Sequence, residues 1–429
     1  MFCTKCGSRN PDDAEFCYKC GKAIFVSHSE DWGEPGSRNQ PIPVAQGDGP
    51  LELLNAPVLA VEQPANPQAG LTITQCLGIL LFVLVIASVV GWFWSSKSKT
   101  PSLNLLVWEG YADPAFVRGF EEQYHCKVSA SYMGSSDELV AKLRGGNTGN
   151  YDVISPSSDV ATSIALAGLA APLDLTKLPT YNQLSQQLTY LPLVRVKGRV
   201  FGVPFMWGSD PLIYDTTAFP QPPDSWSVFW ETKYRGKISV WDDLSTVYMA
   251  AQVLGFDKPE PTQLYNLTDE QLEAVKKKLL ELKPNVRKMW SSGGELTNLF
   301  QNHEVVAAMG WPLMTNQLRK ANFPVGETIP KENTTGWIDH LMITAGSENK
   351  ELAHQFLEYM LGAEVQKKVT DITGYTPANP EAAHYMTADE VKSLHMDDVD
   401  NYQRRLYFLQ DVPRRAKYIE VWNEVKAAR

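Results

Sequence analysis

Hydrophobic and polar positions divide the chain into stretches with different patterns. Residues 1–24 contain few apolar residues, residues 25–72 are polar and rich in Pro and Gly, and residues 73–94 carry no charge. From residue 102 to residue 429, short apolar runs alternate with helical patterns. This alternation is typical of β/α chains and predicts an α/β architecture with parallel sheets.

Apolar runs in the last stretch predict buried strands. We expect these strands at LNLLVW, YDVISP, GKISVWDD, VVAAMGWP and HLMITAG. Helices are expected nearby, at DPAFVRGFEEQY, DVATSIALAGLA and TDEQLEAVKKKLLELKP. Asp113 before Pro114 is a typical helix start.

The uncharged stretch 73–94 predicts a single-pass membrane anchor. As a helix its 22 residues would span roughly 30 Å, and Trp92 and Trp94 stand where amphipathic rings favour the interface. A buried helix of a soluble core is the weaker interpretation, because such helices rarely lack polar residues on every face. A cleaved signal peptide is disfavoured, because the apolar run begins far beyond the usual position.

Residues 25–72, before the span, predict a disordered linker. Seven prolines lie between Pro35 and Pro67, with glycines among them and few aromatic residues. Such a segment cannot bury enough surface to offset the entropy of ordering it.

Four of the six cysteines form two C-x-x-C pairs at the N-terminus: Cys3, Cys6, Cys17 and Cys20. Four thiolates at this spacing predict a closed tetrahedral Zn²⁺ site, whose metal supplies the folding energy of so short a segment. An iron site of the rubredoxin kind usually has its pairs further apart, and a disulfide framework is the other alternative. The segment 1–24 resembles the zinc ribbons found at the N-termini of many prokaryotic membrane proteins.

Charge and motifs exclude some function classes. The net charge of −10 is spread along the 429 residues, which argues against nucleic acid and mildly favours a cationic ligand. The seven histidines are scattered, and no Ser/His/Asp set, phosphate loop or H-E-x-x-H motif is present. We interpret His340, beside Asp339, as a strand-end neighbour facing away, and predict no catalysis.

Aromatic residues and carboxylates recur at the ends of the predicted strands. The set comprises Trp108, Tyr111, Ser157, Trp241, Asp242, Asp243, Trp311, Trp337 and Asp339. In open α/β sheets ligands bind beyond the carboxyl ends of the strands, so these side chains are expected to converge. Indole faces attract ammonium groups and carboxylates fix the charge, which suits a slender aliphatic polycation. Each Trp taken alone is more often a packing residue, and Asp242 is also a candidate helix cap.

The order of these motifs resembles the periplasmic spermidine/putrescine-binding proteins, the solute receptors of polyamine ABC importers. The resemblance runs from about Leu103 to Gln410 and includes VWEGYADPAFVRGFEEQY, YDVISPS, FGVPFMWG, GELTNLFQNHEVVAAMGW, GWIDHLMI and ITGYTPAN. It implies a two-lobed, type II periplasmic-binding-protein fold that closes on its ligand by hinge motion. We place lobe 1 at about 102–212 plus 338–385, and lobe 2 at about 213–337 plus the C-terminal segment.

The resemblance also implies a set of ligand-binding residues. Motif by motif it assigns Trp108, Tyr111, Ser157, Asp243, Trp311, Trp337, Asp339, Tyr375 and Gln410. Two positions depart from the spermidine-binding pattern: Thr246 replaces a second glutamate, and Asp159 replaces a tyrosine. Asp159 is therefore added to the expected ligand set, and the preferred length of the polyamine stays open.

The expected domains imply an inner-membrane protein with the N-terminus in the cytoplasm and the receptor outside. Lys97 and Lys99 follow the span and favour the opposite orientation, but the rule is weak before a long domain. A tethered importer subunit beside an ABC permease is the main hypothesis. The alternative is a sensor that signals through the membrane to a partner of the zinc ribbon. Co-purification of a permease and ATPase would favour the importer.

Overall fold

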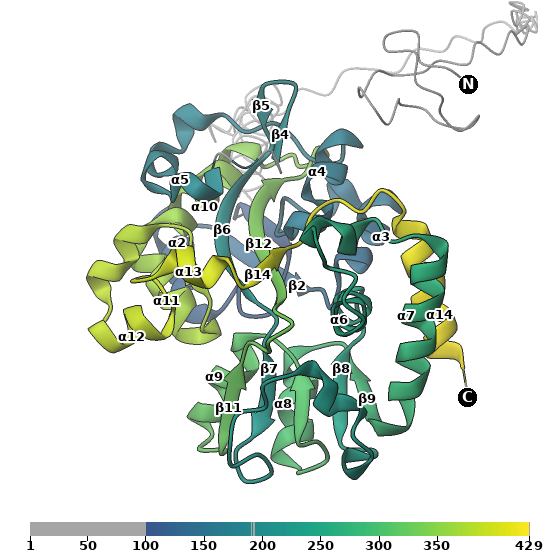
Figure 1. Ribbon diagram of the computed structural model, residues 1–429. Coiled ribbons are helices and arrows are strands. Elements are labelled where there is room, and N and C mark those ends of the chain that lie inside the picture. Colours follow the sequence, from purple (N-terminus) through teal and green to yellow (C-terminus); the bar gives the residue numbers. More distant parts are fainter. Residues whose placement is uncertain (1–99, 190, 192–193, 429) are drawn as a thin grey trace, which may run out of the picture. The chain divides into compact units, whose positions relative to one another are not determined.

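The computed structural model describes residues 100–428, apart from 190, 192 and 193, and these residues form two main β-sheets with helices around them (Figure 1). The strands of the first sheet, in spatial order, are β13 (Thr376–Pro377), β6 (Gly202–Ser209), β12 (Thr334–Ile343), β3 (Val153–Ile154), β1 (Ser102–Val107) and β2 (Lys127–Tyr132), with β14 (Leu406–Phe408) also paired to β12. The second sheet has the order β11 (Val325–Thr328), β7 (Leu212–Asp215), β10 (Ala307–Met309), β8 (Ile238–Trp241) and β9 (Val286–Trp290). A small hairpin pairs β4 (Arg195–Val196) with β5 (Arg199–Val200).

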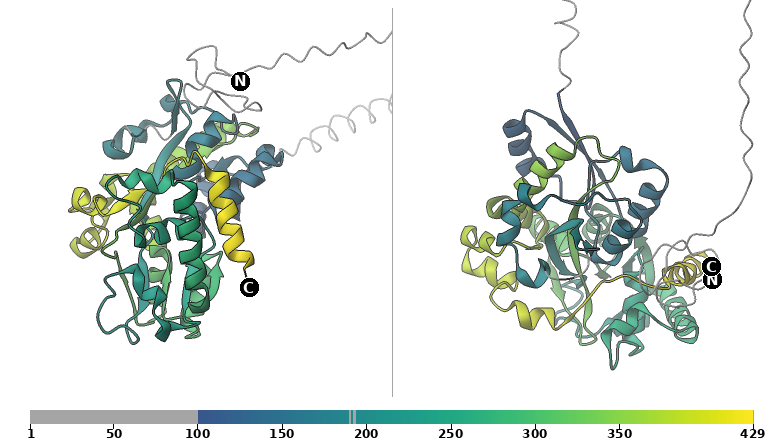
Figure 2. Two further views of the ribbon diagram at one scale, coloured as in Figure 1. Left: turned by 45° about the vertical axis from the view of Figure 1, so that its right-hand side comes forward. Right: turned by 90° about the horizontal axis from the view of Figure 1, so that it is seen from above.

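Each sheet and its helices make one lobe. The first lobe has the helices α2 (Pro114–Tyr124), α3 (Ser136–Arg144), α4 (Ser158–Leu166), α5 (Gln186–Thr189), α10 (Lys350–Leu361), α11 (Ala363–Thr373), α12 (Ala388–Ser393) and α13 (Val399–Gln403). The second lobe has α6 (Ser245–Val253), α7 (Asp269–Leu282), α8 (Gly293–Gln301), α9 (Pro312–Lys320) and α14 (Arg415–Ala427). The C-terminal helix α14 lies against α7 (Figure 2). The prediction of a two-lobed α/β fold is confirmed for the described part of the chain.

The local predictions are confirmed where the sequence signals are strong. LNLLVW covers all of β1 except its first residue, GKISVWDD contains β8, and TDEQLEAVKKKLLELKP contains α7. Helix α2 begins after Asp113, whose Oδ1 accepts a hydrogen bond from the backbone N–H of Ala115 at 2.8 Å. Side-chain oxygens favour this position because the first N–H groups of a helix have no partner within it.

The expectation of parallel sheets is wrong for several strands. In the first sheet β12 runs antiparallel to both β3 and β6, and in the second sheet β7 runs antiparallel to β10 and β11. All residues of β6 and β12 are buried, and each strand contains a short apolar run, PFMW in β6 and LMI in β12. Short apolar runs are also typical of buried parallel strands, and they do not distinguish the two directions.

Within the described residues, three segments cross between the lobes: 210–211, 329–333 and 409–414. The first two are joined through Asp210. Its backbone N–H donates to Thr335 O at 3.0 Å, its carbonyl accepts from Thr334 Oγ1 at 2.6 Å, and its Oδ2 accepts from Thr335 Oγ1 at 2.5 Å. The two crossings are therefore held together where β6 ends and β12 begins.

Several predictions concern residues outside those described. These are the four cysteines of the zinc ribbon, the linker 25–72 and the membrane span 73–94. Over residues 100–428, no helix has both the length and the apolar character that crossing a bilayer would need.

Candidate functional site

A cavity lies between the lobes, where residues from both sheets meet. Its lining residues are Trp108, Ser136, Ser157, Trp241, Asp243, Trp311, Trp337, Asp339, Tyr375 and Leu409. The space between these side chains is about 360 Å³ when the part open to solvent is counted. All of these lining residues are buried. The two lobes thus enclose a narrow cavity.

The first lobe contributes residues from a strand end, a helix start and the middle of a strand. Trp108 follows β1 directly, and Ser157 precedes the first residue of α4. Trp337 and Asp339 lie inside β12, not at a strand end as expected, and the register against β6 shifts directly after Asp339. Gly208 of β6 makes room for Trp337, since a Cβ there would lie 2.6 Å from the indole ring.

Asp339 is buried, and its two side-chain oxygens accept hydrogen bonds from different elements. Oδ1 accepts from Ser157 Oγ, and Oδ2 accepts from Tyr111 OH at 2.6 Å. Burial raises the pKa of Asp339 to about 7, although the hydroxyl donors Ser157 and Tyr111 act to lower it. Neither donor carries a positive charge, so the carboxylate has hydrogen bonds but no counter-ion at these contacts.

Asp243 is the carboxylate of the second lobe. Its Oδ1 accepts from the backbone N–H of Ser245 at 3.0 Å, near the start of α6, and its Oδ2 is buried with no hydrogen-bond partner in the described part of the chain. Burial raises the pKa of Asp243 to about 7, and the nearby charge of Asp159 adds to this effect. Asp242 is not the helix cap that the sequence suggested, because the N-cap of α6 is Leu244. Asp242 instead accepts from Trp422 Nε1 and Lys426 Nζ, each at 2.8 Å.

Four tryptophans pack together across the lobes. Trp108 of the first lobe lies 6.1 Å from Trp241 and 5.6 Å from Trp311, centroid to centroid, with the rings edge to face. Behind them Trp290 stacks on Trp241 at 5.5 Å and donates Nε1–H to Met309 O. The wall is therefore rigid and aromatic, and such indole faces favour cations.

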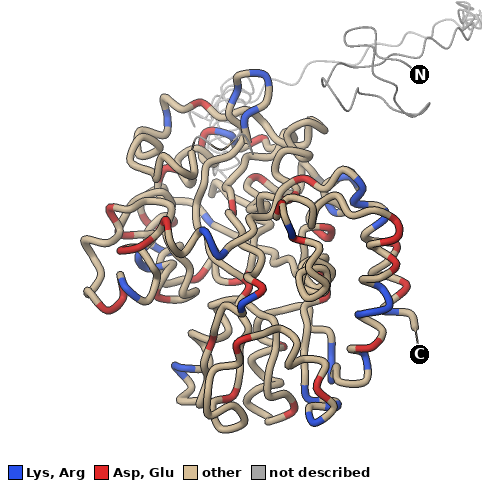
Figure 3. The backbone as a smooth tube through the Cα atoms, in the orientation of Figure 1, with Lys and Arg blue, Asp and Glu red and all other residues tan. Residues whose placement is uncertain are grey.

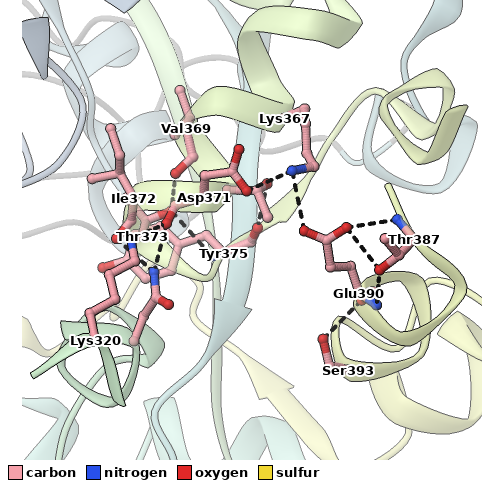
Figure 4. Close-up of polar contacts among 12 residues, drawn as sticks. Lys320, Lys367, Val369, Asp371, Ile372, Thr373, Tyr375, Thr387, Glu390 and Ser393 are labelled. Carbon is pink, nitrogen blue, oxygen red and sulfur yellow. Dashed lines mark hydrogen bonds and ion pairs between the residues drawn. The ribbon is translucent and has the colours of Figure 1, made fainter. Parts of the chain in front are cut away.

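Tyr375 and Trp337 form a second aromatic wall, with ring centroids 4.6 Å apart. Tyr375 comes directly after the turn that ends α11, where Gly374 has a φ of +73°. Its backbone N–H donates to Thr373 Oγ1, and its carbonyl accepts from Thr370 Oγ1 (Figure 4).

The same end of α11 contacts the second lobe. Lys320 Nζ of α9 donates to Asp371 O at 2.5 Å, and Asn316 Nδ2 donates to Asp371 O and Ile372 O, each at 2.9 Å (Figure 4). Donors at a helix C-terminus satisfy carbonyls that have no partner within the helix. These contacts connect the segment that carries Tyr375 to the second lobe.

Comparison with known proteins identifies the family. A family model of bacterial extracellular solute-binding proteins matches residues 115–396. The chain belongs to this family. A zinc-ribbon family model matches residues 2–24.

Two curated relatives and one solved structure illustrate the likeness of this solute-binding protein. Spermidine/putrescine-binding periplasmic protein 1 of Haemophilus influenzae is 29% identical over 318 residues, which cover 71% of this chain and 86% of the relative. The putrescine-binding periplasmic protein PotF of Escherichia coli is 27% identical over 354 residues, which cover 78% of this chain and 93% of that protein. The substrate-binding protein PotD of Streptococcus pneumoniae has a TM-score of 0.62 at 21% identity, over 76% of this chain and 99% of that structure, and supports the fold.

Seven of the ten predicted ligand-binding residues line the cavity: Trp108, Ser157, Asp243, Trp311, Trp337, Asp339 and Tyr375. Tyr111 lies one hydrogen bond behind the wall, on Asp339. Gln410 is not among the lining residues, although its neighbour Leu409 is. That these residues bind ligand stays a prediction.

The two departures from the spermidine-binding pattern do not reach the cavity wall. Thr246 is buried, and its Oγ1 donates to Trp241 O at 2.6 Å, inside the turn that begins α6. Asp159 accepts from Ser136 Oγ and pairs with Arg415. The carboxylate of Asp159 therefore has a partner within the protein.

Sequence reasoning left three lining residues out of the predicted set. Trp241 is one of the aromatic residues at the predicted strand ends, but the family resemblance does not assign it to the ligand. Ser136 and Leu409 lie outside the motifs that carry the resemblance. His340 is buried in the middle of β12, and burial lowers its pKa to about 4. It is therefore uncharged at neutral pH.

We expect Asp339 to make stability pH-dependent. Its pKa of about 7 lies above the ordinary 3.8, so the folded protein holds a proton that the unfolded chain has lost. The contribution of Asp339 to stability is therefore greatest below pH 3.8 and is lost as pH rises from there through about 7. Asp339→Asn removes this titration, so the thermal midpoint of the variant, relative to that of the wild type, should rise from pH 5 to pH 8. The corresponding change in the difference between their free energies of unfolding is on the order of 1–3 kcal/mol.

Thermal melts of both proteins across this pH range test the expectation. Asp224→Asn, at an exposed acid, is the matched control and should follow the wild type. A difference in thermal midpoint between Asp339→Asn and the wild type that stays constant from pH 5 to pH 8 would contradict the expectation.

Proposed function

We propose that this solute-binding protein captures a polyamine of the putrescine/spermidine class in the cavity between its lobes. The proposal rests on one observation: Asp243 and Asp339 are both buried at the cavity, and no Lys or Arg is among its lining residues. A buried carboxylate without a cation is unfavourable, and a cationic ligand would remove this cost. The raised pKa values of both carboxylates have the same origin.

The aromatic walls support the choice of an aliphatic amine. Methylene groups between two ammonium groups pack on indole and phenol faces, while each ammonium gains about 0.5–2 kcal/mol from a nearby ring. The names of the curated relatives, which are spermidine/putrescine-binding and putrescine-binding proteins, agree with this ligand class.

The second part of the proposal concerns transport. The protein would hand its ligand to the permease of an ABC importer, as a receptor anchored by the span 73–94. The zinc ribbon would then lie in the cytoplasm and the solute-binding domain, residues 102–429, outside. Cys3, Cys6, Cys17 and Cys20 fit zinc by their chemistry, since four thiolates in two C-x-x-C pairs complete a tetrahedral site.

Polyamine binding is tested by calorimetric titration of the purified full chain with putrescine, cadaverine, spermidine and spermine. We expect at least one to bind in the micromolar range or tighter. Asp339→Asn should weaken binding by about 100-fold, because a buried ammonium then lacks its carboxylate. Asp224→Asn should bind like the wild type, and butane-1,4-diol, which has the length of putrescine without its charge, should not bind. A folded wild type that gives no heat with any polyamine would refute the proposal.

Anchor, orientation and ribbon are tested together in spheroplasts. Protease added from outside is expected to digest the solute-binding domain and to leave a zinc-containing N-terminal fragment in the membrane. Cys3→Ser should remove zinc from that fragment, whereas Cys126→Ser, at a buried thiol of the solute-binding domain, should not. If the solute-binding domain survives the protease, the orientation is the reverse of the one proposed. If the N-terminal fragment is released from the membrane, the proposal of an anchor is refuted.

A further inference from the structure

A resident cation lies behind the cavity wall. Arg415, the first residue of α14, donates from Nε to Asp137 Oδ1 at 2.7 Å and from Nη1 to Asp159 Oδ2 at 2.9 Å. Its side chain is 18% exposed, and its Nη2 is buried with no partner in the part of the chain that the structure covers. A guanidinium stays protonated in proteins. Burial acts to lower the pKa of Arg415, but Asp159 and Asp137 outweigh it and raise the pKa.

Asp159 connects this cation to the cavity. Ser136 lines the cavity and donates from Oγ to Asp159 Oδ1 at 2.8 Å, so Asp159 is one hydrogen bond behind the wall. The charge of Asp159 raises the pKa of both Asp243 and Asp339, and the charge of Arg415 lowers that of Asp243. The pair is thus close enough to influence both cavity carboxylates.

Arg415 comes from the opposite lobe to its partners. Helix α14 is held on the second lobe by the ion pair of Glu424 with Lys276 at 3.0 Å and by Tyr418 OH, which donates to Leu264 O at 2.8 Å. Figure 3 shows charges of both signs along α7 and α14. Asp137 and Asp159 stand in the first turns of α3 and α4 in the first lobe, where a helix favours acidic residues. Arg415 therefore also bridges the lobes.

We propose that Arg415 determines specificity by serving as the third cation of the site. Its single charge offsets one of the two charges of Asp137 and Asp159, and its Nη1 occupies Asp159, the acid that contacts Ser136. Among the carboxylates at the cavity, only Asp243 and Asp339 then remain for the ligand, which matches a diamine and disfavours a triamine or tetraamine. A further ammonium would enter a buried site without a free carboxylate, which is strongly unfavourable. This inference rests on the proposed polyamine function.

The test is the ratio of spermidine to putrescine affinity in the full chain, measured by calorimetry. In the wild type, putrescine should bind at least tenfold more tightly than spermidine. Arg415→Gln frees Asp159, and the ratio should move at least tenfold toward spermidine. Because the variant also loses a bridge between the lobes, both affinities are expected to fall by a common factor, which cancels in the ratio.

Three variants separate the charge effect from a structural one. Arg414→Gln, whose side chain binds Leu267 O and Asp269 on the second lobe, is the matched control and should leave the ratio unchanged. The double variant Arg415→Gln/Asp159→Asn should return the ratio to the wild-type value. Asp159→Asn alone removes one negative charge behind Ser136 while Arg415 keeps its contact with Asp137, so the ratio should move further toward putrescine.

The outcomes distinguish this inference from the proposed function. A wild type that binds no polyamine refutes both. A wild type that binds polyamines but prefers spermidine, or a folded Arg415→Gln with an unchanged ratio, refutes the role of Arg415 alone. If Arg415→Gln fails to fold, Asp159→Asn decides by the direction in which its ratio moves.

Discussion

Two carboxylates buried between the lobes, Asp243 and Asp339, constrain the rest of the structure. Each comes from a different lobe, and each has a pKa raised to about 7 by burial. An ionised carboxylate out of contact with water is tolerated only when hydrogen bonds and an opposite charge compensate it. Hydroxyl groups of Ser157 and Tyr111 supply hydrogen bonds to Asp339, but they supply no charge. A cationic ligand would complete the site, and its binding would favour the closed lobes.

Side chains of each lobe bind backbone groups of the other lobe. Glu109 of the first lobe accepts from the backbone N–H of Gly293, near the start of α8, at 2.9 Å. Trp241 donates from Nε1 to Gly134 O at 3.0 Å, and a Cβ at Gly134 would lie 2.3 Å from Ser291 O. Only glycine allows so close an approach. The hydrogen bonds of Asp210 to Thr334 and Thr335 join two of the segments that cross between the lobes. The lobes would turn about these segments.

Local sequence signals predicted much of the fold, and the family resemblance predicted most of the cavity wall. The start of α2 at Asp113 and the strand β8 follow from capping and from apolar runs, which act within a few residues. The antiparallel course of β12 could not be read from the sequence, because a strand buried on both faces is apolar in either direction. Trp337 and Asp339 were expected at a strand end because the predicted strand began at His340. They lie in mid-strand because β12 begins earlier, at Thr334, in a segment whose polar residues are buried.

The pairing of Asp159 with Arg415 shows a second limit. The two residues are 256 positions apart, and only the packing of α14 on the second lobe brings them together. From the sequence, Asp159 was expected to be available to the ligand, because it stands where the spermidine-binding pattern has a tyrosine of the cleft. The interpretation of a single side chain thus depended on a contact between distant segments, which periodicity and spacing do not encode.

The central claim is that a cationic ligand replaces protons on the buried carboxylates, and calorimetry measures this replacement directly. Putrescine is titrated into the full chain at pH 7 in phosphate and in Tris, buffers whose enthalpies of protonation differ. Because groups with a pKa of about 7 are partly protonated at this pH, binding should release protons, and the affinity should fall by about tenfold or more from pH 7.5 to pH 5.5. Tight binding without proton release, at an affinity that stays constant over this range, would contradict the account.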